Sequence, residues 1–266
     1  MVFNTAKVMS KGQIILPVDI RRRMRLSTGD HVVLIYENDR VILMNPAIYA
    51  EQLQKSAVGE WEKAGIHSQE DLDNLMRDSL IEDEIYSFGG YDWRILDVQD
   101  GKVLLLSEYL LETRAYHESE VNITWANSTL RQYLNSEFYN RFSAEEKARI
   151  AETRVLNNDN PWYDTKGGYS TFDKVFLLSV EEVVEYFGDS GQLKNRPRGK
   201  SYIDDKYNNA RIAKCLGGEV YWWLLRSSGY KSTYAASVSS FGILDVLGDG
   251  VYHSDGYIRP ALWLNL

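Results

Sequence analysis

Basic side chains cluster near the start of this 266-residue chain, whose net charge is −8. Residues 1–46 hold seven Lys or Arg residues against four acidic residues, which gives this segment a charge of +3. Guanidinium groups bind phosphates and guanine edges through paired hydrogen bonds, and the phosphate contribution is strongly salt-dependent. Nucleic-acid contact is therefore one interpretation of this end of the chain, and a solvated helix face is the plainer one. The seven bases are Lys7, Lys11, Arg21, Arg22, Arg23, Arg25 and Arg40.

Tyrosine and serine are frequent in a second segment, between Gly229 and Pro260. Tyrosine gives rigid contact area and serine gives adaptable hydrogen bonds, a combination typical of binding loops. The segment therefore favours a ligand-binding surface. The alternative is a fixed loop region whose aromatic side chains pack against the rest of the domain.

The residues that would be needed for catalysis are sparse. Cys215 is the single cysteine, so it can supply neither a disulfide nor a reactive pair, and we expect a buried, inert thiol. The four histidines show no metal-ligand spacing. We therefore expect no enzyme, no cofactor and no metal site. These histidines are His31, His67, His117 and His253.

The composition is that of an ordinary globular protein, with 44% hydrophobic and 26% charged residues. The longest apolar run, Val220–Leu225, is too short to span a bilayer. The first residues lack the basic-then-apolar plan of a signal peptide. We expect a cytoplasmic protein without a membrane partner.

The elements that must position the basic residues are short. Alternating apolar residues predict four strands, and Pro17–Met24 reads as a short helix with proline in its first turn. So small a segment cannot form a stable core alone. We therefore expect it to fold together with a second copy, which would double the positive charge on one surface. The predicted strands are Lys7–Met9, Gln13–Leu16, His31–Tyr36 and Arg40–Met44.

Two further regions follow this segment. Residues 47–80 show helical spacing and predict a helical connector, and residues 81–266 predict an α+β domain. The resulting domain boundaries are 1–46, 47–80 and 81–266, and after Leu225 we expect glycine-punctuated loops. The predicted helices of the last region are Ser128–Phe138, Ala144–Ala151 and Val180–Phe187; its predicted strands are Trp93–Val98, Lys102–Leu106, Val175–Leu178, Tyr221–Leu225 and Ala261–Leu264.

The run Ala6–Pro17, with Ile20-Arg21, Gly29-Asp30 and Val41–Leu43, resembles the AbrB/SpoVT/MazE family. That resemblance implies a domain-swapped β-hairpin dimer that binds double-stranded DNA. It also leaves open a module that serves only for dimerisation. The residues that it implies for DNA contact are Lys7, Lys11, Gln13, Arg21 and Arg22, with Arg23 and Arg25 nearby.

The run Trp222–Gly229 and the ending Ile258–Leu264 resemble a bacterial family related to the C-type-lectin fold. That fold includes the variable proteins of diversity-generating retroelements, in which adenine-rich codons of a C-terminal block are rewritten. The resemblance implies a variable surface interleaved with fixed residues, and Lys231 departs from the adenine pattern. The implied ligand-binding residues are Tyr230, Thr233, Tyr234, Ser237, Ser239, Phe241, Asp245, Asp249, Tyr252, His253, Ser254 and Asp255.

Together these features predict a homodimer, or an oligomer built from dimers. Its first module would bind DNA, and its C-terminal domain would bind an unidentified protein or small ligand. The alternative is a retroelement-type variable binding protein in which the N-terminal module only dimerises, so that the paired domains gain avidity.

Overall fold

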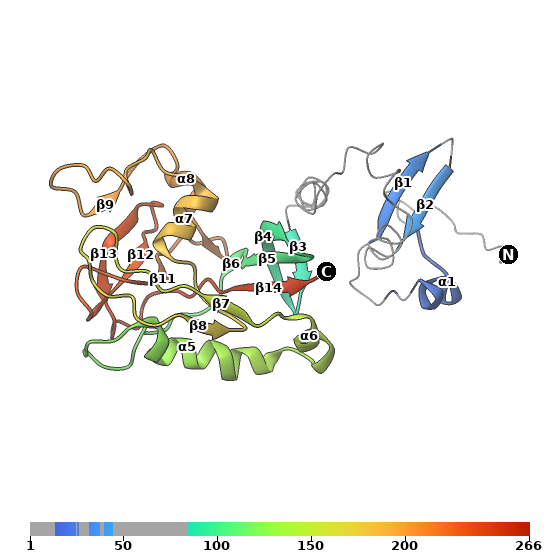
Figure 1. The fold of residues 1–266 in the computed structure, drawn as a ribbon, viewed down its shortest axis with the longest axis horizontal. Helices are drawn as coiled ribbons and strands as arrows, with labels where there is room; N and C mark the ends of the chain where they lie inside the picture. Colours follow the sequence, from blue (N-terminus) through green and yellow to red (C-terminus); the bar gives the residue numbers. More distant parts are fainter. Residues whose placement is uncertain (1–13, 25, 27–31, 38–39, 45–84) are drawn as a thin grey trace. The chain divides into compact units, whose positions relative to one another are not determined.

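The computed structural model describes residues 14–24, 26, 32–37, 40–44 and 85–266 (Figure 1). The chain divides into two compact units, Met1–Leu72 and Asp73–Asn265. The domain boundaries at residues 46 and 80 stay predictions. The predictions that fall outside the described residues concern the strand Lys7–Met9, the connector 47–80, and the DNA-contact residues Lys7, Lys11, Gln13 and Arg25.

The described residues of the N-terminal unit form a hairpin and a short helix. Strands β1 (Val33–Glu37) and β2 (Arg40–Met44) pair antiparallel. Helix α1 (Val18–Arg23) begins directly after Pro17, because a residue without an N–H suits the start of a helix. The predicted helix and hairpin are confirmed. Of the predicted strand Gln13–Leu16, the described part forms only a bridge at Ile14.

The first sheet of the larger unit joins strands from both ends of that unit. Its order is β14-β5-β4-β3, with every neighbouring pair antiparallel. Strand β5 is buried from Val103 to Ser107, which explains its continuous apolar run. The three strands predicted here are confirmed. The strands are β3 (Ile85–Phe88), β4 (Tyr91–Gln99), β5 (Lys102–Ser107) and β14 (Ala261–Asn265).

The second sheet occupies much of the segment for which loops were predicted. Strands β11 (Trp223–Ser228), β12 (Tyr234–Val238), β13 (Leu244–Gly250) and β9 (Tyr202–Ile203) lie in the order β11-β12-β13-β9. The expectation of loops after Leu225 was therefore wrong for β12 and β13. Their glycines interrupt the sequence pattern but fit within the sheet. Gly248 has φ +79°, and a Cβ there would lie 2.2 Å from the Ala235 carbonyl oxygen.

Short helices follow the predicted positions closely. Helix α5 (Thr129–Tyr133) continues through a π-helical turn, η3 (Leu134–Phe138), and a 3₁₀ turn, η4 (Tyr139–Arg141), on the side of the domain below β7 and β8 (Figure 1). Helices α6 (Ala144–Arg149) and α7 (Val180–Phe187) each begin with a Ser–Glu capping box. All three predicted helices are confirmed. Two further pieces are η2 (Trp125–Asn127) and α8 (Asn208–Arg211).

Two small strand pairs complete the unit. Strands β6 (Tyr109–Leu110) and β10 (Lys214–Cys215) pair parallel, and β7 (Thr153–Val155) pairs antiparallel with β8 (Thr171–Asp173). The predicted strand Val175–Leu178 was wrong, because only Phe176 forms a bridge there, to Ala261. All four residues of this segment are apolar and buried, and a short apolar run indicates burial without specifying a strand.

Both helices and strands build the larger unit, which confirms the α+β class. Its core contains Trp93, Trp125 and Trp223, each fully buried. Five residues between Gly229 and Pro260 are also buried: Ala235, Ala236, Val238, Val251 and Arg259. Within the described residues, no helix is long and apolar enough to cross a membrane.

Candidate nucleic-acid interface and ligand surface

Helix α1 presents three arginines on the surface of the N-terminal unit. Arg21, Arg22 and Arg23 fill its last turn and are exposed, and none of the residues of α1 is buried. Cations at a helix C-terminus interact favourably with the helix dipole, so the sequence can hold three charges here without disrupting the helix. The described part of the predicted DNA surface is therefore an exposed guanidinium cluster.

The N-terminal unit also exposes apolar side chains that a soluble module normally covers. Five aliphatic residues are more than half exposed, although the unit is small. They come from the segment before α1, from α1 itself and from both strands of the hairpin. These residues are Ile14, Ile15, Val18, Leu34 and Val41.

The structure separates the predicted ligand-binding residues into two groups at opposite ends of the β12–β13 hairpin. Tyr234 pairs with Gly250 at one end, and Val238 pairs with Leu244 at the other. A five-residue strand spans roughly 13 Å between its terminal residues. The first end carries Tyr230, Thr233, Tyr234, Asp249, Tyr252 and His253, and the second carries Ser239 and Phe241; Ser254 and Asp255 lie in the segment that leads on from His253 to Tyr257.

Three of the predicted ligand residues have structural roles instead. Ser237 is buried within the sheet and was wrongly placed on the binding surface. The Asp245 carboxylate accepts hydrogen bonds from the backbone N–H groups of residues 247 and 248, both at 3.1 Å, and burial raises the pKa of this carboxyl. The Ser239 hydroxyl accepts from the N–H groups of residues 241 and 243, both at 3.2 Å, and so closes the turn.

Aromatic rings form a connected row at the first end of the hairpin. The Tyr230 ring lies edge-on to the Tyr234 ring at 4.7 Å and to the Tyr163 ring at 6.1 Å between centroids. The Lys231 ammonium lies 4.7 Å from the Tyr234 ring centroid and 5.3 Å from that of Tyr230. The charge and hydrogen bond of Tyr230 raise the pKa of Tyr234, so the Tyr234 hydroxyl stays protonated near neutrality. We call Tyr163, Tyr230 and Tyr234 the tyrosine row.

An arginine from another loop extends this row. The Arg196 guanidinium stacks 4.4 Å from the Tyr163 ring centroid and 4.9 Å from that of Trp162, and it donates a hydrogen bond of 2.9 Å to the Tyr163 hydroxyl. Sequence reasoning missed Tyr163, Arg196 and Lys231 as surface partners. The basic run 194–200, which contains Arg196, was the available sequence signal, because four cations without an acid form a local positive patch in an acidic chain.

A second small cluster lies beside the row. The His253 ring nitrogen Nδ1 is 3.0 Å from an Asp249 carboxylate oxygen, and the Tyr252 ring packs edge-on against the His253 ring at 4.5 Å. Asp249 lies close to the tyrosine row, since it pairs with Ala235 across the hairpin and its charge contributes to the raised pKa of Tyr234. The structure thus brings five predicted ligand residues together: Tyr230, Tyr234, Asp249, Tyr252 and His253.

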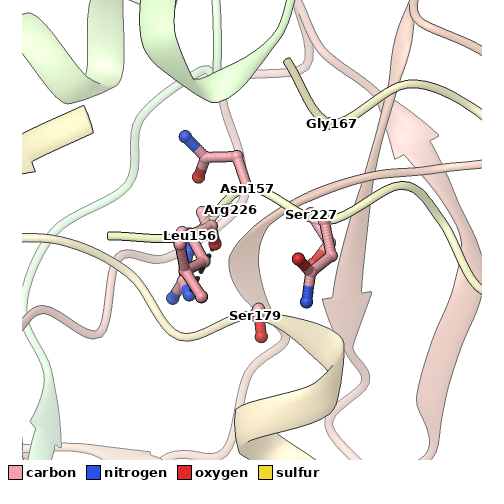
Figure 2. A pocket seen from close by; sticks show the side chains of 7 residues that line it. Leu156, Asn157, Gly167, Ser179, Arg226 and Ser227 are labelled. Carbon is pink, nitrogen blue, oxygen red and sulfur yellow. Dashed lines mark hydrogen bonds between the residues drawn. The ribbon is translucent and has the colours of Figure 1, made fainter. Parts of the chain in front are cut away.

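A shallow polar depression lies around the buried Arg226 side chain. Arg226 and Ser179 line a shallow depression with Leu156, Asn157 and Ser227 (Figure 2). Arg226 donates to both Glu182 carboxylate oxygens and to the Leu177 and Leu156 carbonyls. The lining holds two serines but neither histidine nor cysteine, so it offers no nucleophile–base pair.

The remaining chemically reactive side chains are dispersed. Cys215 is half-buried, which corrects the expectation of a buried thiol; it lies at the end of β10, beside Tyr257. The His117 ring accepts a hydrogen bond of 3.3 Å from the Thr129 N–H and thus supports the start of α5. Among the residues that the structure describes, no three His, Cys, Asp or Glu side chains gather as metal ligands do.

Comparison with known families divides the chain in the same order. Residues 5–47 match the family described as antidote-toxin recognition MazE, bacterial antitoxin, which agrees with the resemblance of the N-terminal segment. No curated protein and no solved structure gives a match. Residues 100–266, more than half of the chain, match a domain of unknown function (DUF6273). The chain thus belongs to the DUF6273 family and carries a MazE-like segment before the family domain.

Proposed function

We propose that this protein is a dimeric DNA-binding regulator of the antitoxin type, with a C-terminal domain that binds a ligand or partner. The observation that carries the proposal is the exposed arginine cluster of α1 within a segment that matches the MazE family. Arginine binds phosphates and guanine edges, and this cluster lies on the surface where a duplex could reach it.

Dimerisation follows from the apolar surface of the N-terminal unit. Leaving Ile14, Ile15, Val18, Leu34 and Val41 in water costs free energy, at about 25 cal/mol for each Å² of apolar surface. A second copy of the same module can cover these side chains. The dimer would then place two sets of Arg21, Arg22 and Arg23 on one assembly.

The tyrosine row supports ligand binding by the C-terminal domain. Tyr230 and Tyr252 keep more than a third of their surface exposed, and the Tyr230 backbone N–H donates to the Leu247 carbonyl of β13. Rigid aromatic side chains on a fixed scaffold lose little entropy on binding. The C-type-lectin-like fold and retroelement diversification stay predictions from sequence resemblance, as does a cytoplasmic location.

The same surface also favours the alternative function. If the N-terminal module only dimerises, two tyrosine rows in one molecule would bind a multivalent partner with added avidity. Clustered adenine-site variation in codons 230–257 among sibling gene copies would then be expected. Evenly spread variation would argue against diversification.

Fluorescence anisotropy of the full-length protein on its own upstream DNA tests the DNA-binding function. The double variant Arg21→Ala/Arg22→Ala removes four charges from each dimer. We expect the slope of log affinity against log salt, measured between 50 and 200 mM, to become shallower by about 3.6, because each phosphate contact contributes about 0.9.

The matched control is Arg154→Ala/Lys214→Ala, which removes two exposed cations per chain from the C-terminal unit. Its binding curve should match that of the wild type. If both double variants weaken binding equally, the arginine cluster is not the interface. If the wild type does not bind duplex DNA at 50 mM salt, the DNA-binding function is rejected in favour of the alternative, in which the N-terminal module only dimerises.

A further inference from the structure

The loop between α7 and β9 contains an unusual concentration of positive charge. Residues 194–200 read Lys-Asn-Arg-Pro-Arg-Gly-Lys, with four cations and no acid, in a chain whose net charge is −8. All four cations are exposed. Within the described residues, none of them forms an ion pair with a carboxylate. We call Lys194, Arg196, Arg198 and Lys200 the cation loop.

The cation loop is held in place by specific contacts. Arg196 donates to the Lys200 carbonyl at 2.8 Å and to the Trp162 carbonyl at 3.0 Å. The Trp162 indole donates to the Leu193 carbonyl at 2.9 Å, and Asp189 accepts from the Leu193 N–H at 2.7 Å. Such contacts preorganise the loop, so less conformational entropy is lost when an anion binds.

The cation loop is continuous with the tyrosine row. Arg196 stacks on Tyr163, whose ring contacts Tyr230, and Lys231 lies against Tyr230 and Tyr234. On the other side of the loop, the Lys200 ammonium lies 4.9 Å from the Tyr202 ring centroid. Cations and aromatic rings are therefore in continuous contact from Arg196 through Tyr163 and Tyr230 to Lys231.

We propose that the cation loop, Lys231 and the tyrosine row form a binding site for single-stranded nucleic acid. Phosphates would contact the five cations, and unstacked bases would pack against Tyr163 and Tyr230. Sequence-tolerant binding of single strands uses this combination of a cationic path and aromatic stacking surfaces. A duplex keeps its bases stacked and cannot use the rings, and an acidic peptide would use the cations alone. This site lies in the family domain and is separate from the α1 arginines.

Anisotropy with fluorescein-labelled oligonucleotides of twelve deoxythymidines or twelve uridines tests the site in the full-length protein. For single strands each phosphate contact contributes about 0.7 to the salt slope, so five contacts predict that affinity falls about a hundredfold from 50 to 200 mM salt. Comparing the affinities for the two oligonucleotides shows whether the site prefers single-stranded DNA or single-stranded RNA.

Two variants separate charge from stacking. Lys194→Glu/Arg198→Glu leaves Arg196 to hold the loop and should reduce the salt effect to about threefold, since the effective number of contacts falls to about one. Tyr230→Ser should weaken binding about tenfold at both salt concentrations without changing the slope, because a stacked base contributes about 1–3 kcal/mol.

Controls assign the effect to this surface. Arg154→Glu/Lys214→Glu makes the same charge change elsewhere on the domain and should bind nearly as the wild type does. Arg21→Ala/Arg22→Ala should also retain single-strand binding. Loss of binding in that last variant would overturn the proposal by moving the site to the N-terminal unit. Equal binding of a labelled decaglutamate peptide, with no effect of Tyr230→Ser, would overturn it in favour of an acidic peptide.

Discussion

Replacing Glu182 by glutamine tests the contact that joins the second sheet to helix α7. The Glu182 carboxylate pairs with Arg226 of β11 and also accepts the Ser179 N–H at 3.0 Å in the capping box. The Arg226 side chain is 3% exposed, so its charge has no access to bulk water. Glutamine keeps the size and one acceptor oxygen of glutamate, but it removes the charge that balances this cation and turns an NH₂ group toward its donors.

The expected cost follows from this burial. Removing one partner of a buried ion pair destabilises a protein by about 3–5 kcal/mol, because the remaining charge is left uncompensated. Glu182 itself is 26% exposed, and the Leu156 and Leu177 carbonyls still accept from the guanidinium, so the lower end of that range applies. About 3 kcal/mol corresponds to a fall in Tm of roughly 6–12 °C for a domain of this size.

Thermal unfolding followed by circular dichroism measures this fall, and Glu181→Gln is the matched control. Both glutamates lie in the first turn of α7, so each variant loses about 0.5 kcal/mol of interaction with the helix dipole. Only Glu182 pairs with Arg226. If the two variants unfold at the same temperature, the pair with Arg226 contributes nothing and the reasoning is refuted.

Two further substitutions test the β12–β13 hairpin. Asp245→Asn keeps the acceptor for the Gly248 N–H and removes a carboxyl whose pKa burial raises. Because the unfolded chain ionises this group at lower pH than the folded chain does, the contribution of Asp245 to wild-type stability falls as pH rises above about 4. The variant should therefore gain stability over the wild type between about pH 4 and 7 in denaturant titrations, with no difference at about pH 3. Gly248→Ala forces a Cβ toward the Ala235 carbonyl at φ +79° and should lower the unfolding free energy by at least about 2 kcal/mol, whereas an unchanged midpoint would show that the hairpin relaxes freely.

Local signals were enough to predict the helices. The predicted helix Val180–Phe187 has the bounds that the structure shows, and the structure adds a capping box between Ser179 and Glu182, two residues within the same turn. Pro17 gave the start of α1 for a similar reason. In each case the information lies within one helical turn, so no knowledge of distant partners was needed.

Strands β12 and β13 could not be predicted in the same way. Strand β12 pairs with its sequence neighbours β11 and β13, but β13 also pairs with β9, which lies far from it in sequence. Gly248 reads as a strand breaker, yet its left-handed backbone is what allows the Ala235 carbonyl to approach. We predicted loops from the glycines of this segment, but strand pairing accommodates Gly248 within the sheet.

The candidate surfaces show why a whole-chain charge is a poor guide to binding. A net charge of −8 argues against nucleic-acid contact only when charge is spread evenly, and here residues 1–46 carry +3 while residues 194–200 hold four cations without an acid. Screening limits the reach of distant acidic groups to about 10 Å at ordinary salt, so each basic surface presents its own local field to an anion. The first group was visible in the sequence because it accompanies a known motif. The second group, residues 194–200, could be recognised only from the fold. The fold places Arg196 on Tyr163 and Tyr163 against Tyr230, so a short basic run becomes part of a surface with both charge and stacking area.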